Sequence, residues 1–225
     1  MTIVVRHVHK RYLSAERSVD ALINVSLAAE PGHLTALVGP SGSGKTTMLR
    51  ILACQLRPDA GTILVDGGTV PHVASRAGAK YRRRTVGFVF QEFGLIEQES
   101  ARKNVALPLR YAGVGRKRAN RIAESLLEVL GIADLSDADV RDLSAGQRQR
   151  VAFARAQAND PPVILADEPT SNLDPASRAV VMAALDRLRK SGKTVVVATH
   201  DEALWREADH VVRIANGHIE SGRAS

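Results

Sequence analysis

Gly39-Pro-Ser-Gly-Ser-Gly44-Lys45-Thr46 constrains the architecture more than any other stretch of this 225-residue sequence. Its spacing matches a phosphate-binding loop in full. The glycines allow backbone N–H groups to converge on phosphate oxygens with no Cβ in the way. We expect Lys45 to reach the β- and γ-phosphates of a nucleotide and the Thr46 hydroxyl to ligate Mg²⁺. A Gly/Ser turn without a ligand is the alternative.

The residues on either side of this loop predict a strand before it and a helix after it. Thr35-Ala-Leu-Val is a short apolar run that stops at Gly39. From Lys45 onward the apolar residues recur at helical spacing, namely Met48, Leu49, Leu52 and Leu56. The positive end of this helix dipole would point at the same anion. The order strand, loop, helix therefore favours phosphate binding over a plain turn.

Two adjacent acids follow a second apolar run, Val163-Ile-Leu-Ala-Asp167-Glu168. Such a run predicts a strand that is buried on both faces, and Val195-Val-Val-Ala198 predicts another. Open α/β sheets bind ligands at the carboxyl ends of these strands. Asp167 is suited to hold Mg²⁺, and Glu168 is suited to accept a proton from an attacking water. Without the phosphate loop, an ordinary polar strand end would explain the two acids equally well.

The rest of the chain predicts an α/β core with a helical insertion. From about residue 92 to 160 the pattern is helical. Ser144 and Gln147 have the spacing of a capping box and predict a helix that runs to about residue 158. Asn216-Gly217 predicts a closing hairpin. Short strands are also expected at Thr62–Val65 and Gly87–Phe90.

Composition and charge exclude only a few classes of protein and of binding partner. Cys54 is the single cysteine, which excludes a disulfide framework and a thiol metal cluster, and we expect it in the core. The sequence contains no apolar run long enough to span a bilayer and no signal-peptide core. A formal charge of +7 makes nucleic acid and an anionic membrane surface candidate partners. Aromatics are 4% of the chain and are not interleaved with the basic clusters, so base stacking is not indicated.

A third element, Leu143-Ser-Ala-Gly146-Gln147, makes the chain resemble the ATP-binding-cassette ATPase family. The resemblance covers essentially the full length, with the motifs in the family's order. Tyr12 resembles the aromatic that stacks on adenine, Gly39–Thr47 the Walker A segment and Gln91 the Q-loop. Val163–Glu168 resembles Walker B with its catalytic glutamate, Ser171–Asp174 the D-loop and His200 the switch histidine.

This resemblance implies a set of site residues. ATP binding would fall to Tyr12, Gly39, Pro40, Ser41, Gly42, Ser43, Gly44, Lys45, Thr46 and Thr47. Catalysis would fall to Lys45, Gln91, Glu168 and His200, and Mg²⁺ binding to Thr46, Gln91 and Asp167. The signature residues Leu143, Ser144, Ala145, Gly146 and Gln147 would act on the nucleotide of a second copy, with Asp174 in the D-loop. Ala145 stands where the family usually has glycine, but its backbone N–H remains available to an anion.

The resemblance also implies the fold. We expect an α/β P-loop NTPase core with a mainly parallel sheet, an N-terminal antiparallel β subdomain and an inserted α-helical subdomain. Residues 1–225 would form a single nucleotide-binding domain. Its RecA-like core would span about residues 1–91 and 160–225, and its helical subdomain about residues 92–159.

Three segments resemble the lipoprotein-release, macrolide-export and cell-division group: Gly87–Gln91, Asn104–Leu109 and Glu168–Asp174. They imply an ATPase subunit that energises a separately encoded membrane permease by export or mechanotransmission. We then expect ATP and Mg²⁺ as cofactors, a head-to-tail ATP-dependent dimer, and a cytoplasmic position on the inner face of the membrane. Residues 92–100 differ from the sequence that is usual in this group. We expect this segment to face the permease.

The alternative is a soluble ATPase of the same family that acts on DNA or ribosomes. DNA-repair relatives carry a long coiled coil between Walker A and the signature, and ribosomal relatives carry two cassettes in one chain. This sequence shows one cassette and no heptad array. We therefore expect no specific nucleic-acid partner. A catalytically silent regulator would be expected to lack Glu168 or His200, and both are present.

Overall fold

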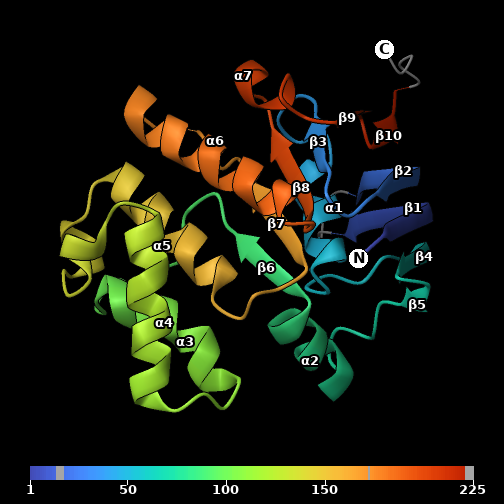
Figure 1. Cartoon of the computed structure of the whole chain (residues 1–225). Coiled ribbons are helices and arrows are strands. Elements are labelled where there is room, and N and C mark those ends of the chain that lie inside the picture. The colour runs from blue at the N-terminus through green and yellow to red at the C-terminus, as the bar shows by residue number, and fades with distance from the viewer. Residues whose placement is uncertain (14–17, 172, 221–225) are drawn as a thin grey trace.

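The phosphate loop joins a central strand to a helix that lies between two β-sheets. The computed structural model describes residues 1–13, 18–171 and 173–220. In these residues one sheet has the strand order β10-β9-β3-β8-β7-β6 and the other has the order β2-β1-β4-β5 (Figure 1). Two sheets with inserted helices confirm the α/β architecture expected from the sequence.

The larger sheet is parallel from β9 to β6, and β10 runs antiparallel to β9. Its strands are β3 (Leu34–Val38), β6 (Val86–Val89), β7 (Val163–Asp167), β8 (Thr194–Thr199), β9 (His210–Ala215) and β10 (His218–Ile219). Every residue of β3, β7 and β8 is buried, as their continuous apolar runs predict. Asn216 and Gly217 have φ values of 48° and 77° and close the predicted hairpin.

The smaller sheet is antiparallel throughout and covers helix α1 (Lys45–Leu52). Its strands are β1 (Ile3–Leu13), β2 (Ser18–Ala29), β4 (Ala60–Val65) and β5 (Gly68–Thr69). Met48, Leu49 and Leu52 of α1 belong to a buried cluster with residues of both sheets. The helix ends at Leu52 and not at the predicted Leu56, because Cys54 adopts a left-handed φ of 54°.

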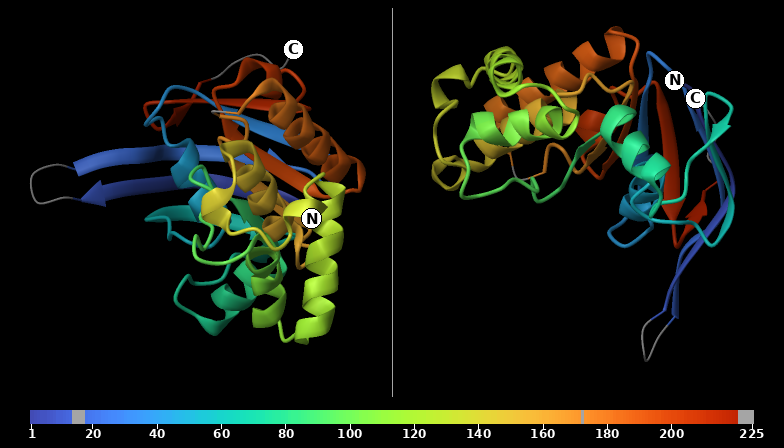
Figure 2. Two further views of the ribbon diagram at one scale, coloured as in Figure 1. Left: turned by 90° about the vertical axis from the view of Figure 1, so that its left-hand side faces the viewer. Right: turned by 90° about the horizontal axis from the view of Figure 1, so that it is seen from below.

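Three helices follow β6 in the chain and precede β7. They are α3 (Ala101–Tyr111), α4 (Arg116–Val129) and α5 (Ala145–Gln157), with 3-10 segments at Ala133–Leu135 and Val140–Asp142. In the view from below in Figure 2, these helices and the antiparallel sheet lie on opposite sides of the molecule. Helix α5 begins at the predicted capping box: Ser144 Oγ accepts from the N–H of Gln147 at 3.3 Å, and Gln147 Oε1 accepts from the N–H of Ser144 at 2.8 Å.

The remaining helices are α2 (Arg76–Arg84), α6 (Pro175–Lys190) and α7 (Glu202–Trp205), which the sequence patterns did not predict. Helix α6 contributes Val181, Leu185 and Leu188 to the second buried cluster, which also contains the cores of α3, α4 and α5. No helix in the described ranges combines the length and the apolar character needed to cross a membrane.

Gly87 allows β6 to pack directly against the backbone of α5. A Cβ at this position would lie 2.1 Å from the carbonyl oxygen of Ala156 and 2.9 Å from Cδ1 of Ile164. A backbone carbonyl cannot swing away as the end of a flexible side chain can. Any side chain at Gly87 would therefore push the strand and the helix apart.

Gly87→Ala should lower the free energy of unfolding by about 1–3 kcal/mol, the usual range for overpacking. Gly68→Ala in β5 is a matched control, because its Cβ would meet the carbonyl oxygen of Val65 at an ordinary 3.5 Å. Urea unfolding followed by circular dichroism measures both variants. Equal stability of the two variants would contradict the close packing at Gly87.

Candidate nucleotide-binding site

The phosphate loop is held between backbone segments of both sheets. Gly39 has a φ of 150°, and a Cβ there would lie 2.0 Å from the carbonyl oxygen of Ile214 in β9. Gly44 has a φ of 111°, and a Cβ there would lie 2.3 Å from the carbonyl oxygen of Ala21 in β2. A larger residue at either position would need a rarely adopted conformation and would displace a neighbouring strand. The backbone around the loop therefore admits only glycine at these two positions.

Lys45 is a buried cation with no acidic partner. It is 6% exposed, and its Nζ donates to the carbonyl oxygens of Gly39 at 2.7 Å and Pro40 at 2.9 Å. Within the described part of the chain, Lys45 forms no salt bridge with an aspartate or glutamate. The hydroxyl of Ser43 in the same loop is buried without a hydrogen-bond partner. An ammonium without a counter-ion and an unpaired hydroxyl in one loop fit the oxygens of a phosphate group.

Two of the residues expected to hold Mg²⁺ meet at the carboxyl end of β7. Thr46 Oγ1 donates to Asp167 Oδ1 at 3.1 Å. Asp167 is 4% exposed; burial raises the pKa of its carboxyl group, and the hydrogen bond from Thr46 acts in the opposite direction. Hydroxyl and carboxylate oxygens are the ligands that Mg²⁺ prefers in proteins. The donor set therefore fits a magnesium ion that also contacts phosphate.

Glu168 follows Asp167 directly and contacts His200. Its Oε2 lies 2.9 Å from Nδ1 of His200 and accepts from the backbone N–H of His200 at 3.3 Å. The N–H of Glu168 donates to the carbonyl oxygen of Ala198 in β8 at 2.8 Å. Its φ of 46° is uncommon for a residue with a side chain and indicates a constrained backbone. The structure thus brings the predicted general base and the predicted switch histidine together.

These groups line one cleft with a volume of about 590 Å³, which is within the usual range for small-molecule sites. The predicted residues in its lining are Tyr12, Ser41, Gly42, Ser43, Gly44, Lys45, Thr46, Thr47, Gln91, Glu168 and His200. Gly39, Pro40 and Asp167 lie beside these residues but outside the lining. The hydroxyl of Tyr12 lies 3.4 Å from Thr47 Oγ1, so an aromatic side chain from β1 reaches the loop.

The cleft also contains residues that the sequence did not predict. Val19 and Ala21 of β2 belong to its lining, and Val19 pairs with Tyr12 across the β1–β2 register. Val19 is 57% exposed, and an exposed apolar residue next to an aromatic one suits the face of a nucleotide base. Next to the cleft, Thr170 Oγ1 donates to Asp201 Oδ2 at 2.7 Å and joins the segments that follow β7 and β8.

The signature segment lies apart from this cleft. None of Leu143, Ser144, Ala145, Gly146 and Gln147 belongs to its lining, and neither does Asp174. Gly146 packs against the start of α6, since a Cβ there would lie 2.1 Å from Ser177 Oγ and 3.3 Å from Asp174 Oδ2. Asp174 caps α6 and accepts from the N–H of Ser177 at 2.9 Å. Asn172 of the predicted D-loop lies outside the described residues.

The chain is similar in sequence to known ATP-binding proteins of transporters. Residues 22–171 match the family model described as ABC transporter. The chain is 45% identical over 213 residues to an uncharacterized ABC transporter ATP-binding protein of Thermotoga maritima, and the match covers 95% of this chain and 91% of that protein. It is 40% identical to the lipoprotein-releasing system ATP-binding protein LolD 2 of Caulobacter vibrioides, over 98% and 97% of the two chains. It is 42% identical to the macrolide export ATP-binding/permease protein MacB 1 of Yersinia pestis, with 97% of this chain matched to 34% of that longer protein.

Solved structures give the same result for the fold. A dimeric ATP-binding cassette in a post-hydrolysis state, bound to ADP and Pi, superposes with a TM-score of 0.91 at 37% identity. The match covers 97% of this chain and 96% of that cassette. A dimeric bacterial ABC transporter cassette matches with the same values. From its motifs, its cleft and these relatives, the chain belongs to the ABC transporter family and is an ATP-binding-cassette ATPase.

Proposed function

We propose that this chain hydrolyses ATP as the motor subunit of a separate membrane permease of the export or mechanotransmission type. The observation that carries the proposal is the buried ammonium of Lys45, which has no acidic partner among the described residues and belongs to the same loop as the unpaired hydroxyl of Ser43. Burial of a cation costs free energy, and an anion that pairs with the cation offsets this cost. The triphosphate of ATP is the anion that fits this loop, this cleft and the family.

We assign roles to five of the side chains that line the cleft. The ring of Tyr12 stacks on adenine, with Val19 beside it. Lys45 leaves the carbonyl groups that it now contacts and binds the β- and γ-phosphates. Glu168 accepts a proton from the attacking water, and His200 contacts the γ-phosphate from the neighbouring strand end. The resulting phosphoryl transfer depends mainly on positioning and on electrostatic stabilisation.

We propose that Mg²⁺ is held by Thr46, Asp167 and Gln91. The first two already share a hydrogen bond, and Gln91 is exposed at the end of β6 in the same cleft. When bound, Mg²⁺ neutralises charge on the phosphate oxygens. The buried position of Asp167 keeps its carboxylate directed at Thr46, so the pair is arranged before the nucleotide enters.

Glu168→Gln should bind ATP normally but hydrolyse it at least about 10²-fold more slowly, because an amide cannot take the proton of the water. Glu202→Gln is a suitable control, since Glu202 is an exposed residue of α7 that pairs with Arg206 outside the cleft. Phosphate release gives the rate, and fluorescent-nucleotide titration gives the binding constant. Hydrolysis by Glu168→Gln at the unmodified rate would mean that another residue is the base.

We further propose that a second copy of this chain completes the site. The signature segment lies outside the cleft of its own chain, and Ser144 caps the N-terminus of α5. A capped helix N-terminus can bind an anion through its free N–H groups and its dipole. In a head-to-tail dimer the signature of one chain would face the γ-phosphate in the other. The relatives solved as dimers support this arrangement.

Mixing two inactive variants tests the composite site. Lys45→Ala and Ser144→Arg should each fail to dimerise with ATP. In the mixed dimer, one site joins both damaged elements, but the other joins an intact phosphate loop to an intact signature. Light scattering should then show an ATP-dependent dimer in the mixture and monomers in each variant alone. A mixture that stays monomeric at every ratio would contradict the head-to-tail model.

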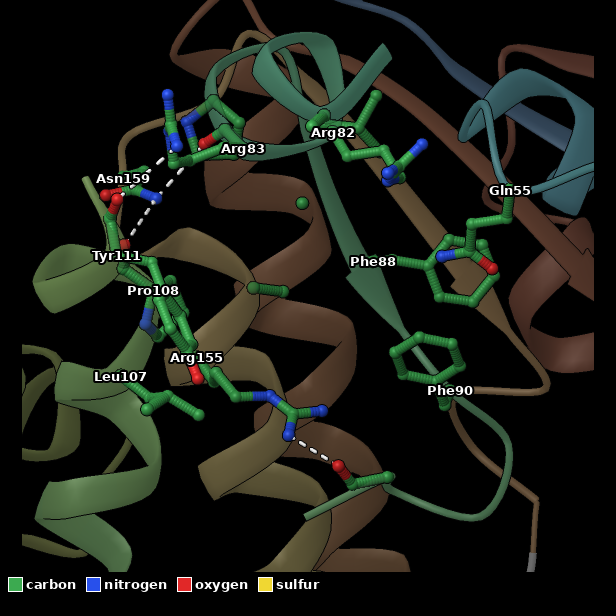
Figure 3. A pocket seen from close by; sticks show the side chains of 16 residues that line it. Gln55, Arg82, Arg83, Phe88, Phe90, Leu107, Pro108, Tyr111, Arg155 and Asn159 are labelled. Carbon is green, nitrogen blue, oxygen red and sulfur yellow. Dashed lines mark hydrogen bonds between the residues drawn. The ribbon is translucent and has the colours of Figure 1, made fainter. Parts of the chain in front are cut away.

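For the permease, we propose a docking groove between the proposed core (residues 1–91 and 160–225) and the proposed helical subdomain (residues 92–159). The groove has a volume of about 480 Å³. Phe88 of β6 and Phe90, which directly follows this strand, lie on one side, and Leu107, Pro108 and Tyr111 of α3 lie on the other (Figure 3). The apolar lining suits a short helix of the permease on the cytoplasmic side of the membrane. The exposed Arg83 at the rim favours an acidic residue on that helix.

Hydrogen bonds hold the walls of this groove and the chain segment that follows Gln91. Asn159 Nδ2 donates to the carbonyl oxygens of Arg83 at 3.0 Å and Pro108 at 3.2 Å, and so bridges the two walls (Figure 3). Arg155 donates to the carbonyl oxygens of Gly94 at 2.6 Å and Phe93 at 2.8 Å. These carbonyl groups belong to the segment that follows Gln91. This is the segment expected from the sequence to face the permease.

Tyr111→Asp should abolish association with the permease, because Tyr111 is 72% exposed in the groove and a carboxylate there would lose apolar contact. Val129→Asp is the matched control, since Val129 is an apolar residue of α4 that is 49% exposed and lies outside the groove. Co-purification with a co-expressed candidate permease measures binding. The same yield of complex with both variants would rule out the groove as the docking site.

A further inference from the structure

Three side chains with metal-binding atoms converge far from the ATP cleft. They are Glu30 and His33 in the turn between β2 and β3, and His210 at the start of β9. One ligand atom from each residue lies within 4.8 Å of those of the other two. The two imidazole rings have centroids 5.3 Å apart and are tilted by 32°. Glu30 and His210 are exposed and His33 is half-buried, so an ion has access from solvent.

The backbone holds the turn of Glu30 and His33 in place. The N–H of His33 donates to the carbonyl oxygen of Glu30 at 3.3 Å, and the N–H of Gly32 donates to that of Lys193 at 3.0 Å. The carbonyl oxygen of His33 in turn accepts from the N–H of Val195 in β8 at 3.1 Å. Both ligands of the turn are therefore fixed relative to the parallel sheet.

A contact of the His33 ring favours the tautomer that a metal ligand requires. Its Nδ1 lies 3.2 Å from the carbonyl oxygen of Pro31. A carbonyl oxygen only accepts, so this contact favours the tautomer in which Nδ1 carries the proton and the lone pair is on Nε2. A ring nitrogen that donates to a backbone carbonyl is the usual support for a metal-ligating histidine.

His210 is held beside this turn by the pairing of β9 with β3, in which it lies opposite Thr35. Its neighbour Asp209 accepts from the N–H of Leu34 at 2.7 Å and donates its own N–H to the carbonyl oxygen of Leu34 at 2.9 Å. The basic residues nearby are already neutralised. Arg189 pairs with Asp209 and Asp186, and Lys193 pairs with Asp160.

The surrounding electrostatics favour a cation. The carbonyl oxygen of Arg189, in the last turn of α6, lies 3.9 Å from the Cβ position of Gly32. The carboxyl end of a helix carries partial negative charge. The side chain of Glu30 adds a full negative charge. The cluster therefore offers two imidazoles and a carboxylate beside the carboxyl end of a helix.

We propose that Glu30, His33 and His210 form a binding site for a Zn²⁺-like transition-metal dication. Imidazole together with carboxylate selects zinc and its neighbours in the first transition row, whereas Mg²⁺ and Ca²⁺ prefer oxygen ligands. Three protein ligands leave the fourth tetrahedral position to water. The bound ion ties the β2–β3 turn to β9 and so joins the two sheets at their common end.

This site is separate from the magnesium ligands of the ATP cleft. His33 immediately precedes β3, and Gly39 of the phosphate loop immediately follows it. His33 and Gly39 are six residues apart, and a strand rises about 3.3 Å per residue, so roughly 20 Å separate this turn from the phosphate loop. Zinc at Glu30, His33 and His210 therefore acts on the stability of the fold and does not take part in phosphate chemistry.

The test is thermal unfolding of the full chain after treatment with a chelator, in the absence of nucleotide. Added ZnCl₂ should raise Tm in a saturable manner, by roughly 5–10 °C at a hundredfold excess over the dissociation constant. MgCl₂ at the same concentration should not change Tm through this site. Equilibrium dialysis followed by metal analysis gives the number of zinc ions bound per chain.

Variants assign the zinc to these residues. The double variant His33→Ala/His210→Ala should bind one zinc ion fewer per chain and should lose the Tm increase. Glu30→Gln should weaken zinc binding. His218→Ala is the matched control, because His218 is an exposed histidine on the adjacent strand β10 outside the cluster. His200→Ala is a control for zinc that binds in the ATP cleft. This variant should show the same Tm increase with zinc as the unmodified chain. An undiminished zinc count in the double variant, or no rise in Tm with zinc in the unmodified chain, would overturn the proposal.

Discussion

Close backbone packing around the phosphate loop is the constraint on which the rest of the structure depends. The glycines at both ends of the loop lie against carbonyl oxygens of β9 and β2, where no side chain fits. The β9–β10 turn completes the arrangement. The N–H of Gly217 donates to the carbonyl oxygen of Ser43 at 3.2 Å, and the carbonyl oxygen of Gly217 accepts from the N–H of Ile23 at 2.8 Å. Strands of both sheets therefore meet at the loop, and neither sheet can shift without moving it.

The parallel register then brings the chemical groups to one edge. Val38 pairs with Thr199, and Asp167 pairs with Ala198, so the loop after β3, the acids of β7 and the histidine after β8 end at the same level. Strand β8 lies between the other two. This order explains why Glu168 contacts the residue that follows β8, and why Thr46 of α1 reaches the end of β7. Residues more than one hundred positions apart in the chain become neighbours because parallel strands share their carboxyl ends.

The sequence predicted those features that depend on local pattern. The buried strands, the phosphate loop, the capping box and the closing hairpin each have a characteristic spacing, and the structure has them where they were expected. Features that depend on distant contacts were missed. Val19 enters the cleft through a β1–β2 register that shifts at several points, and Gly87 is required only because α5 crosses it. Likewise, His33 and His210 meet only because β3 pairs with β9. The end of α1 was misplaced because hydrophobic spacing does not reveal the left-handed backbone of Cys54.

Strand β6 leads from the proposed docking groove to the ATP cleft. Phe88 of β6 and Phe90, which directly follows this strand, both line the groove, with ring centroids 4.5 Å apart. Gln91 is the next residue and lines the ATP cleft. Because β6 is packed between β7 and α5, a shift of this strand would also displace Phe90 and Gln91, which directly follow it. Because Arg155 also holds the carbonyl groups just beyond Gln91, the groove and the cleft share one structural element, and pressure from a docked helix would reach the nucleotide through it.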